Sequence, residues 1–185
     1  IPARYSGDAY YNRSTGVIYP FGYGLSYTSF TQKFVTQASE LESAINAKNG
    51  LDDKVSVQVE VQNVGSVAGK EVVQLYVHAP YTTGGIEKAE VSLVSYGKTG
   101  LLQPGEKEIV TVDVRIGDIA SFDYDDANAN NWFGYEIEAG AYEFRLQKNS
   151  HEKIASLDVT LTAKTETLDN DDDATNNTPF SNGDD

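Results

Sequence analysis

Alternation between apolar and polar residues is the feature of this sequence that most restricts its fold. Valines occupy every second position of residues 55–61, with Ser, Gln and Glu between them, as expected of a β-strand with one buried face. The same period of two returns in four later groups: Val73, Leu75 and Val77; Val110, Val112 and Val114; Tyr142, Phe144 and Leu146; Leu157, Val159 and Leu161. Turn residues separate these groups, so the sequence predicts an all-β chain folded as an antiparallel, immunoglobulin-like β-sandwich.

Less regular segments complete the expected set of elements. Residues 29–37 and 88–97 are each predicted to contain a strand, and residues 63–69 form a Gly-rich turn. Gln103–Glu106 carries Pro and Gly at the positions that a type II turn favours.

One segment fits a helix better than a strand. Ser39–Glu42 has the spacing of a capping box, and Leu41, Ala44 and Ile45 lie on one helical stripe. We therefore expect a helix over residues 40–48. A helix of this length is not stable alone, so a strand or a simple connection remains an alternative.

The charge balance excludes two classes of partner. The formal net charge is −14, which offers no basic surface to a nucleic acid or to an anionic membrane. No apolar run approaches the roughly 20 residues that span a bilayer.

The chain has no cysteine, so it has neither disulfides nor a thiolate metal site. Bacterial cytoplasm and secretion both remain open as locations.

Residues 166–185 carry seven acidic and no basic side chains, which predicts a disordered acidic linker or tail. Residues 169–173 place aspartates at the first three ligand positions of a calcium loop. Positions 6 and 12 of that loop require Gly and Glu, but here they are Ala174 and Phe180. We expect no metal site.

The most aromatic stretch of the chain lies near its beginning. Pro20 fixes its own φ, and glycines at 22 and 24 permit backbone conformations closed to other residues. Five large apolar side chains accompany them: Tyr19, Phe21, Tyr23, Leu25 and Tyr27. Eight of the 20 aromatic residues fall within the first 30 positions, more than a short arm can bury against itself. We expect an aromatic N-terminal arm that docks on another domain.

Several of these motifs resemble glycoside hydrolase family 3, the β-glucosidase-like enzymes. Residues 20–28 are similar to the segment that ends the α/β sandwich domain of that family. Four later stretches, in the family's order, resemble the fibronectin type III-like domain that follows it: 63–69, 71–76, 101–106 and 138–142. The resemblance implies three parts: residues 1–30 end the α/β sandwich domain, 31–165 are the fibronectin type III-like domain, and 166–185 are the linker.

The resemblance also implies a function for a longer parent protein, and the lack of any methionine leads us to expect such a parent. The parent would hydrolyse terminal β-linked sugars, mostly glucosides, with retention and without a cofactor. In the family, the nucleophile comes from a catalytic barrel domain and the acid/base commonly from the α/β sandwich domain. Neither motif occurs here, so we expect no catalytic residue and no activity of the chain alone. Its partners would be the parent's barrel and α/β sandwich domains, and the arm would border the substrate cleft.

Five carboxylates near the predicted loop at 123–138 are expected to be solvated surface groups: Asp123, Asp125, Asp126, Glu136 and Glu138. Trp132, Phe133 and Tyr135 follow in the same region and could stack on sugar rings, although packing explains them better. Trp132 stands five residues before Ile137, against about two in the family, which indicates a local insertion. A free-standing carbohydrate-binding or adhesive module is therefore the alternative function, and a purely structural spacer is a third.

Overall fold

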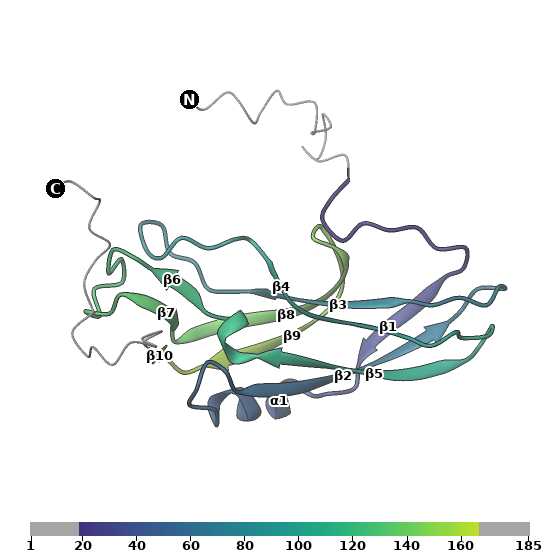
Figure 1. The fold of residues 1–185 in the computed structure, drawn as a ribbon, viewed down its shortest axis with the longest axis horizontal. Helices are drawn as coiled ribbons and strands as arrows, with labels where there is room; N and C mark the ends of the chain where they lie inside the picture. The colour runs from purple at the N-terminus through teal and green to yellow at the C-terminus, as the bar shows by residue number, and fades with distance from the viewer. Residues whose placement is uncertain (1–18, 167–185) are drawn as a thin grey trace.

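The computed structural model describes residues 19–166. Two antiparallel sheets pack face to face (Figure 1). The first sheet has the order β1 (Phe30–Phe34), β2 (Lys54–Asn63), β5 (Lys107–Arg115). The second has the order β4 (Ser92–Lys98), β3 (Val72–His78), β8 (Gly140–Asn149), β9 (Glu152–Leu161). The antiparallel β-sandwich predicted from the alternation is confirmed.

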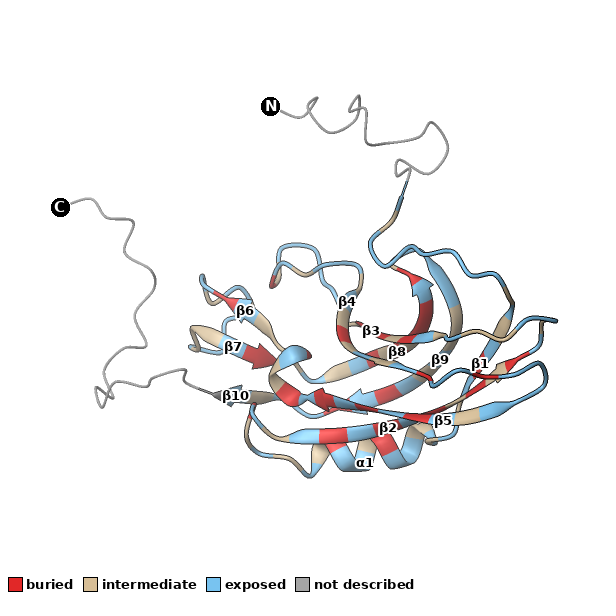
Figure 2. Ribbon diagram, turned by 45° about the vertical axis from the view of Figure 1, so that its right-hand side comes forward, coloured by how far each residue is buried: buried red, intermediate tan, exposed pale blue. Residues whose placement is uncertain are grey.

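The register explains why the alternation marks the core. Val57 lies opposite Val112 and Val59 opposite Val110, so apolar side chains from β2 and β5 share the inner face of the first sheet. Phe144 and other apolar residues of the second sheet belong to the same buried cluster. Figure 2 shows the buried positions recurring along the facing strands. Burial of this single continuous core is the main stabilising contribution to the fold.

A small third sheet closes one end of the sandwich. It consists of β6 (Ser121–Asp123), β7 (Gly134–Ile137) and β10 (Lys164–Glu166), with β7 in the middle. A 3-10 turn, η2 (Ile116–Asp118), leads into it from β5. Strand β10 therefore reaches one residue past the expected domain boundary at 165. The expected N-terminal loop and nearly all of the acidic tail lie outside the described residues.

Helix α1 (Ala38–Asn46) confirms the predicted helix, but the predicted cap and limits were wrong by two residues. The backbone amide of Gln37 donates to Glu40 Oε2 at 2.9 Å, so Gln37, and not Ser39, is the N-cap residue. The reason is that β1 ends early: the amides of Val35 and Thr36 both donate to the carbonyl of residue 58, and the chain turns immediately afterwards. Tertiary contacts stabilise the helix, whose buried face lies against β2 and β9.

The type II turn at Gln103–Glu106 is also present. The Glu106 amide donates to the Gln103 carbonyl at 3.0 Å. Gly105 has a φ of 84°, as the third position of such a turn requires.

Candidate functional site

The apolar arm, residues 19–27, lies on the outer side of the second sheet (Figure 1). The Phe21 carbonyl accepts a hydrogen bond from the Ser150 amide at 2.8 Å. The Gly22 carbonyl accepts one from Gln74 Nε2 at 3.0 Å. These bonds attach the arm to β3 and to the β8–β9 turn.

Gly22 is required by this close approach. Its φ is 80°, and a Cβ there would lie 2.2 Å from Gln74 Oε1 and 2.9 Å from the Tyr76 hydroxyl. Tyr76 donates its hydroxyl proton to Gln74 Oε1 at 2.9 Å and is almost completely buried, although it is not part of the core between the sheets. The backbone of the arm thus fits closely onto the domain.

The side chains of the arm remain in solvent. Their exposed fractions run from 47% for Tyr23 to 100% for Tyr27, with the other three between these values: Tyr19, Phe21 and Leu25. Tyr19 and Tyr23 contact each other, with ring centroids 5.5 Å apart. The arm is therefore a fixed backbone that displays five unburied apolar side chains.

Asn63 joins the end of the arm to the sandwich. It is fully buried, and its Oδ1 accepts hydrogen bonds from the Thr28 hydroxyl at 2.9 Å and the Gly65 amide at 3.0 Å. Its Nδ2 donates to the carbonyls of Val67 at 2.8 Å and Leu102 at 2.9 Å. From the sequence, Asn63 was interpreted only as a turn residue. Its burial could have been predicted, because it continues the alternation of Val55, Val57, Val59 and Val61 on the buried face of the strand.

The prediction that all five loop carboxylates are solvated was wrong for Asp123 and Glu136, which are 1% and 2% exposed. Asp123 accepts hydrogen bonds from the amides of Asp125 and Ala127. Asp125 is exposed, Asp126 is half-buried, and Glu138 is half-buried and ion-paired. The loop folds back over the β6–β7 hairpin, and this places the two carboxyl groups inside it.

Two asparagines of the same loop hold the Glu136 carboxylate. The Nδ2 atoms of Asn128 and Asn130 donate to its two oxygens at 3.1 and 2.7 Å. Burial raises the pKa of Glu136 in spite of these two hydrogen bonds. The loop is built on left-handed backbone at Asp126 and Ala129, with φ values of 49° and 57°, and such positions often lie at functional sites.

Only one of the three predicted sugar-stacking residues has an exposed ring. Trp132 and Phe133 are half-buried, and Trp132 Nε1 donates to the Tyr135 carbonyl at 3.3 Å. Tyr135 is exposed and packs edge-on against Phe122, at a centroid distance of 5.0 Å. Phe122 and Tyr124 are the more exposed aromatic residues here and were missed, because only the β6–β7 pairing reveals that Phe122 lies opposite Tyr135.

A family model described as a fibronectin type III-like domain matches residues 71–150. Residues 71–150 therefore belong to a fibronectin type III-like domain. The chain that contains it is homologous to a region of the family 3 β-glucosidases, as its sequence motifs predicted.

The relatives of this fibronectin type III-like domain are much longer proteins. β-Glucosidase A of Butyrivibrio fibrisolvens is 40% identical over 77% of this chain and 18% of its own length. A β-glucosidase of Ruminococcus albus is 44% identical over 69% of this chain and 12% of its own length. The chain thus spans less than a fifth of either protein.

Solved structures show the same fold. β-Glucosidase 3B of Thermotoga neapolitana, in complex with glucose, matches 82% of this chain and 19% of its own, with 31% identity and a TM-score of 0.59. The β-glucosidase of Paenibacillus barengoltzii matches 82% of this chain and 16% of its own, with 33% identity and a TM-score of 0.61.

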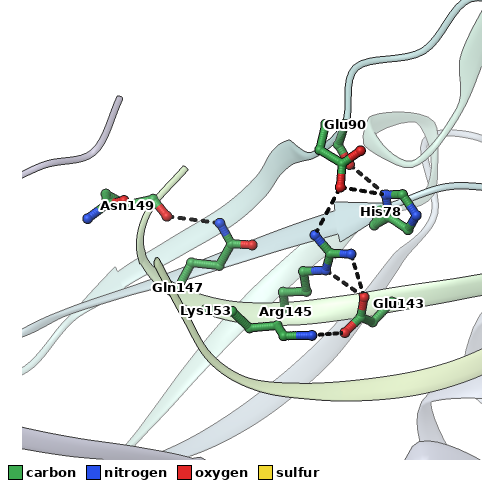
Figure 3. A network of polar contacts seen from close by, with 7 residues as sticks. All are labelled: His78, Glu90, Glu143, Arg145, Gln147, Asn149 and Lys153. Carbon is green, nitrogen blue, oxygen red and sulfur yellow. Dashed lines mark hydrogen bonds and ion pairs between the residues drawn. The ribbon is translucent and has the colours of Figure 1, made fainter. Parts of the chain in front are cut away.

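The fibronectin type III-like domain carries an ionic network on the outer face of its second sheet (Figure 3). Glu143 accepts hydrogen bonds from Arg145 at 2.6 Å and Lys153 at 2.7 Å. Arg145 also contacts the Glu90 carboxylate at 3.6 Å, and His78 Nδ1 lies 2.7 Å from the Glu90 carbonyl oxygen. The network ties β3, β8 and β9 to the loop before β4, and its carboxylates are already paired, which indicates a structural role.

We expect the network to make stability fall at low pH. Burial alone would raise the pKa of Glu143, but hydrogen bonds from Lys153, Arg145 and Ser156 outweigh it and lower the pKa from 4.5 to about 2. A carboxyl with a lowered folded-state pKa contributes stability above its unfolded pKa and loses it as pH falls to the folded one. Thermal unfolding of wild type and Glu143→Gln should therefore differ at pH 6 and converge between about pH 4.5 and 2.

Glu152→Gln is the matched control for that measurement. Glu152 pairs with Lys148 at 2.6 Å, but both side chains are more than half exposed, and exposed pairs contribute only about 0–1 kcal/mol. A Glu143→Gln variant whose pH dependence matched that of wild type and Glu152→Gln would contradict the prediction.

The described part of the chain has neither a cluster of metal-ligating side chains nor a membrane-spanning helix. No three His, Asp or Glu side chains between residues 19 and 166 are grouped so that they could hold a metal ion. Over the same residues, no helix is both long and apolar enough to cross a membrane.

Proposed function

We propose that this chain is a non-catalytic part of a family 3 β-glycosidase of the β-glucosidase type, which hydrolyses terminal β-linked sugars with retention. The domain braces the catalytic barrel and α/β sandwich domains of its parent, and the apolar arm borders the substrate cleft. The observation that carries the proposal is the arm itself: a fixed backbone with five exposed apolar side chains.

Exposure of this kind indicates a partner surface. Scattered apolar side chains are ordinary on a protein surface, but a contiguous run marks an interaction site. The hydrogen bonds at Phe21 and Gly22 hold the run in place before any partner binds, which reduces the entropy lost on docking. Val64 and Val67 are also exposed, in the turn whose amides donate to the Ser29 carbonyl, and they extend the surface beyond the arm.

A chimera tests this role. In β-glucosidase A of Butyrivibrio fibrisolvens, the region matched by this chain would be replaced by residues 19–166. We expect the chimera to release nitrophenol from an aryl β-glucoside, because the arm and sandwich supply the missing brace. The double substitution Phe21→Ser/Leu25→Ser in the chimera should weaken domain docking by about 2 kcal/mol or more. The substituted chimera should therefore lose activity at a temperature at which the unsubstituted chimera stays active.

The control is Ile109→Ser, which removes an exposed apolar side chain from β5 in the first sheet, away from the strands that hold the arm. It should leave the activity and heat resistance of the chimera unchanged. The isolated 185-residue chain should show no turnover above a buffer blank. Turnover by the isolated chain, or full heat resistance of the Phe21→Ser/Leu25→Ser chimera, would contradict the proposed function.

A further inference from the structure

A hollow lies between residues 84–87 and 122–127. Strands β6 and β7 lie at the end of the sandwich away from the start of β1 (Figure 1). The volume of the hollow is about 190 Å³, below the range of about 300–1,000 Å³ typical of sites for drug-sized ligands. One wall is the glycine loop at residues 84–87, and the other is the stretch 122–127. A cavity of this size suits a single small ring.

Two aromatic side chains line the hollow and remain available to a ligand. Phe122 and Tyr124 are both exposed, and the edge contact with Tyr135 fixes the orientation of the Phe122 ring. In the other wall, a Cβ at Gly84 would meet no atom within 4 Å, so the space next to that glycine is open.

Two carboxylates flank the rings. Glu87 and Asp125 line the hollow, and both are exposed. Glu87 Oε1 accepts a hydrogen bond from the Tyr81 hydroxyl at 3.3 Å, and neither carboxylate forms an ion pair with any residue in the described part of the chain. Each therefore has oxygen lone pairs free to accept hydrogen bonds from a ligand.

Hydrogen bonds to neighbouring residues hold both walls of the hollow in place. The buried carboxylate of Asp123 accepts hydrogen bonds from the backbone amides of Asp125 and Ala127. Lys88, next to Glu87, donates to the Pro80 carbonyl at 2.7 Å and to the Glu138 carboxylate. The hollow is thus formed before a ligand arrives, which favours binding.

We propose that this hollow binds a neutral saccharide, with one pyranose ring stacked on Tyr124 and Phe122 and its hydroxyls donating to Glu87 and Asp125. A sugar ring has apolar C–H faces that suit aromatic rings, and neighbouring hydroxyls that suit carboxylate oxygens. An anionic ligand is disfavoured, because the hollow is lined by three carboxylates, those of Glu87, Asp123 and Asp125, and by no Lys or Arg. The proposal rests on the proposed function only for the choice of a β-linked glucose oligomer as the sugar.

The test is a titration of the 185-residue chain with cellobiose, followed by amide chemical shifts in two-dimensional nuclear magnetic resonance. We expect saturable shifts confined to residues 84–87 and 122–127, with a dissociation constant of about 1–10 mM. Tyr124→Ala and Glu87→Gln should each weaken binding by about tenfold. Tyr96→Ala, which removes an exposed aromatic residue of β4, should bind cellobiose like wild type.

Three results would overturn the proposal: no saturable shift, shifts that centre elsewhere, or equal shifts with a short lysine peptide whose side-chain ammonium is free, which would identify a cation site. An unchanged spectrum away from the hollow shows that each variant is folded. If the chimera is active but the isolated chain does not bind cellobiose, the saccharide site is contradicted and the proposed function is not. If the isolated chain binds cellobiose but the chimera is inactive, the proposed function is contradicted and the saccharide site is not.

Discussion

Replacement of Asn63 by alanine is expected to lower the free energy of unfolding by about 3 kcal/mol. The side chain is fully buried and makes four hydrogen bonds. Its removal leaves the Thr28 hydroxyl and the Val67 carbonyl without this partner, and it opens a small cavity. Some partners keep a second bond, since the Gly65 amide also donates to Ser29 and the Leu102 carbonyl also accepts from Gly69. Urea unfolding measures the loss.

Asn63→Asp separates the two halves of this interaction. Aspartate keeps the acceptor but cannot donate, and it places a buried charge beside the carbonyls of Val67 and Leu102. We expect a loss at neutral pH at least as large as for alanine, with partial recovery in acid, because protonation removes the charge and restores one donor. Gln62→Ala, one residue earlier and half-buried, should cost less than about 1 kcal/mol. A wild-type unfolding curve for Asn63→Asp would contradict the assigned role.

The second large effect is expected at the ion pair of Lys88 and Glu138. The Lys88 side chain is only 4% exposed, and its other hydrogen bond is to the Pro80 carbonyl. Glu138→Leu would leave a buried ammonium without its carboxylate, which should cost about 3 kcal/mol. Thermal unfolding and urea unfolding both measure this loss.

The double variant Lys88→Met/Glu138→Leu is the decisive control. It removes both charges and keeps much of the side-chain volume, and apolar replacement of a buried pair is often close to neutral. We therefore expect the double variant to be more stable than Glu138→Leu alone. If the stability losses of Lys88→Met and Glu138→Leu, each measured alone, summed to the loss of the double variant, the two charges would not be coupled, which would contradict the prediction. The exposed pair of Lys148 and Glu152 offers a reference cycle in which the coupling should be below about 1 kcal/mol.

Most of the sandwich could be predicted from the sequence, because a strand with one buried face imposes its period on the side chains. The valines of residues 55–61 lie within β2, and Val110, Val112 and Val114 lie within β5 opposite them. The helix was also visible as a stripe of apolar residues. Its cap was not, because the position at which β1 ends depends on hydrogen bonds to residue 58, which is distant in sequence.

The burial of two carboxylates by the loop after β6 could not be predicted from the sequence, for a physical reason. Its Asp and Asn residues are typical of a solvated turn, yet Asn128 and Asn130 point inward to Glu136. This arrangement depends on left-handed backbone at Asp126, Ala129 and Asn131, and composition does not indicate such backbone at an alanine. The exposed rings of Phe122 and Tyr124 were overlooked for a related reason, since their surroundings are set by the loop at residues 84–87.

The contacts of α1 determine when the domain is able to fold as it is synthesised. Asn46 bonds to Thr160 and Thr162, and the Lys164 ammonium donates to carbonyls at the end of the helix, at sequence separations of 114 to 118. Until β9 emerges from the ribosome, the nine-residue helix lacks one of the two strands against which its buried face packs, and Leu41 and Ile45 stay incompletely covered. A nascent chain stalled before residue 160 should therefore be a target for chaperones and proteases, whereas the finished chain closes over the same two side chains.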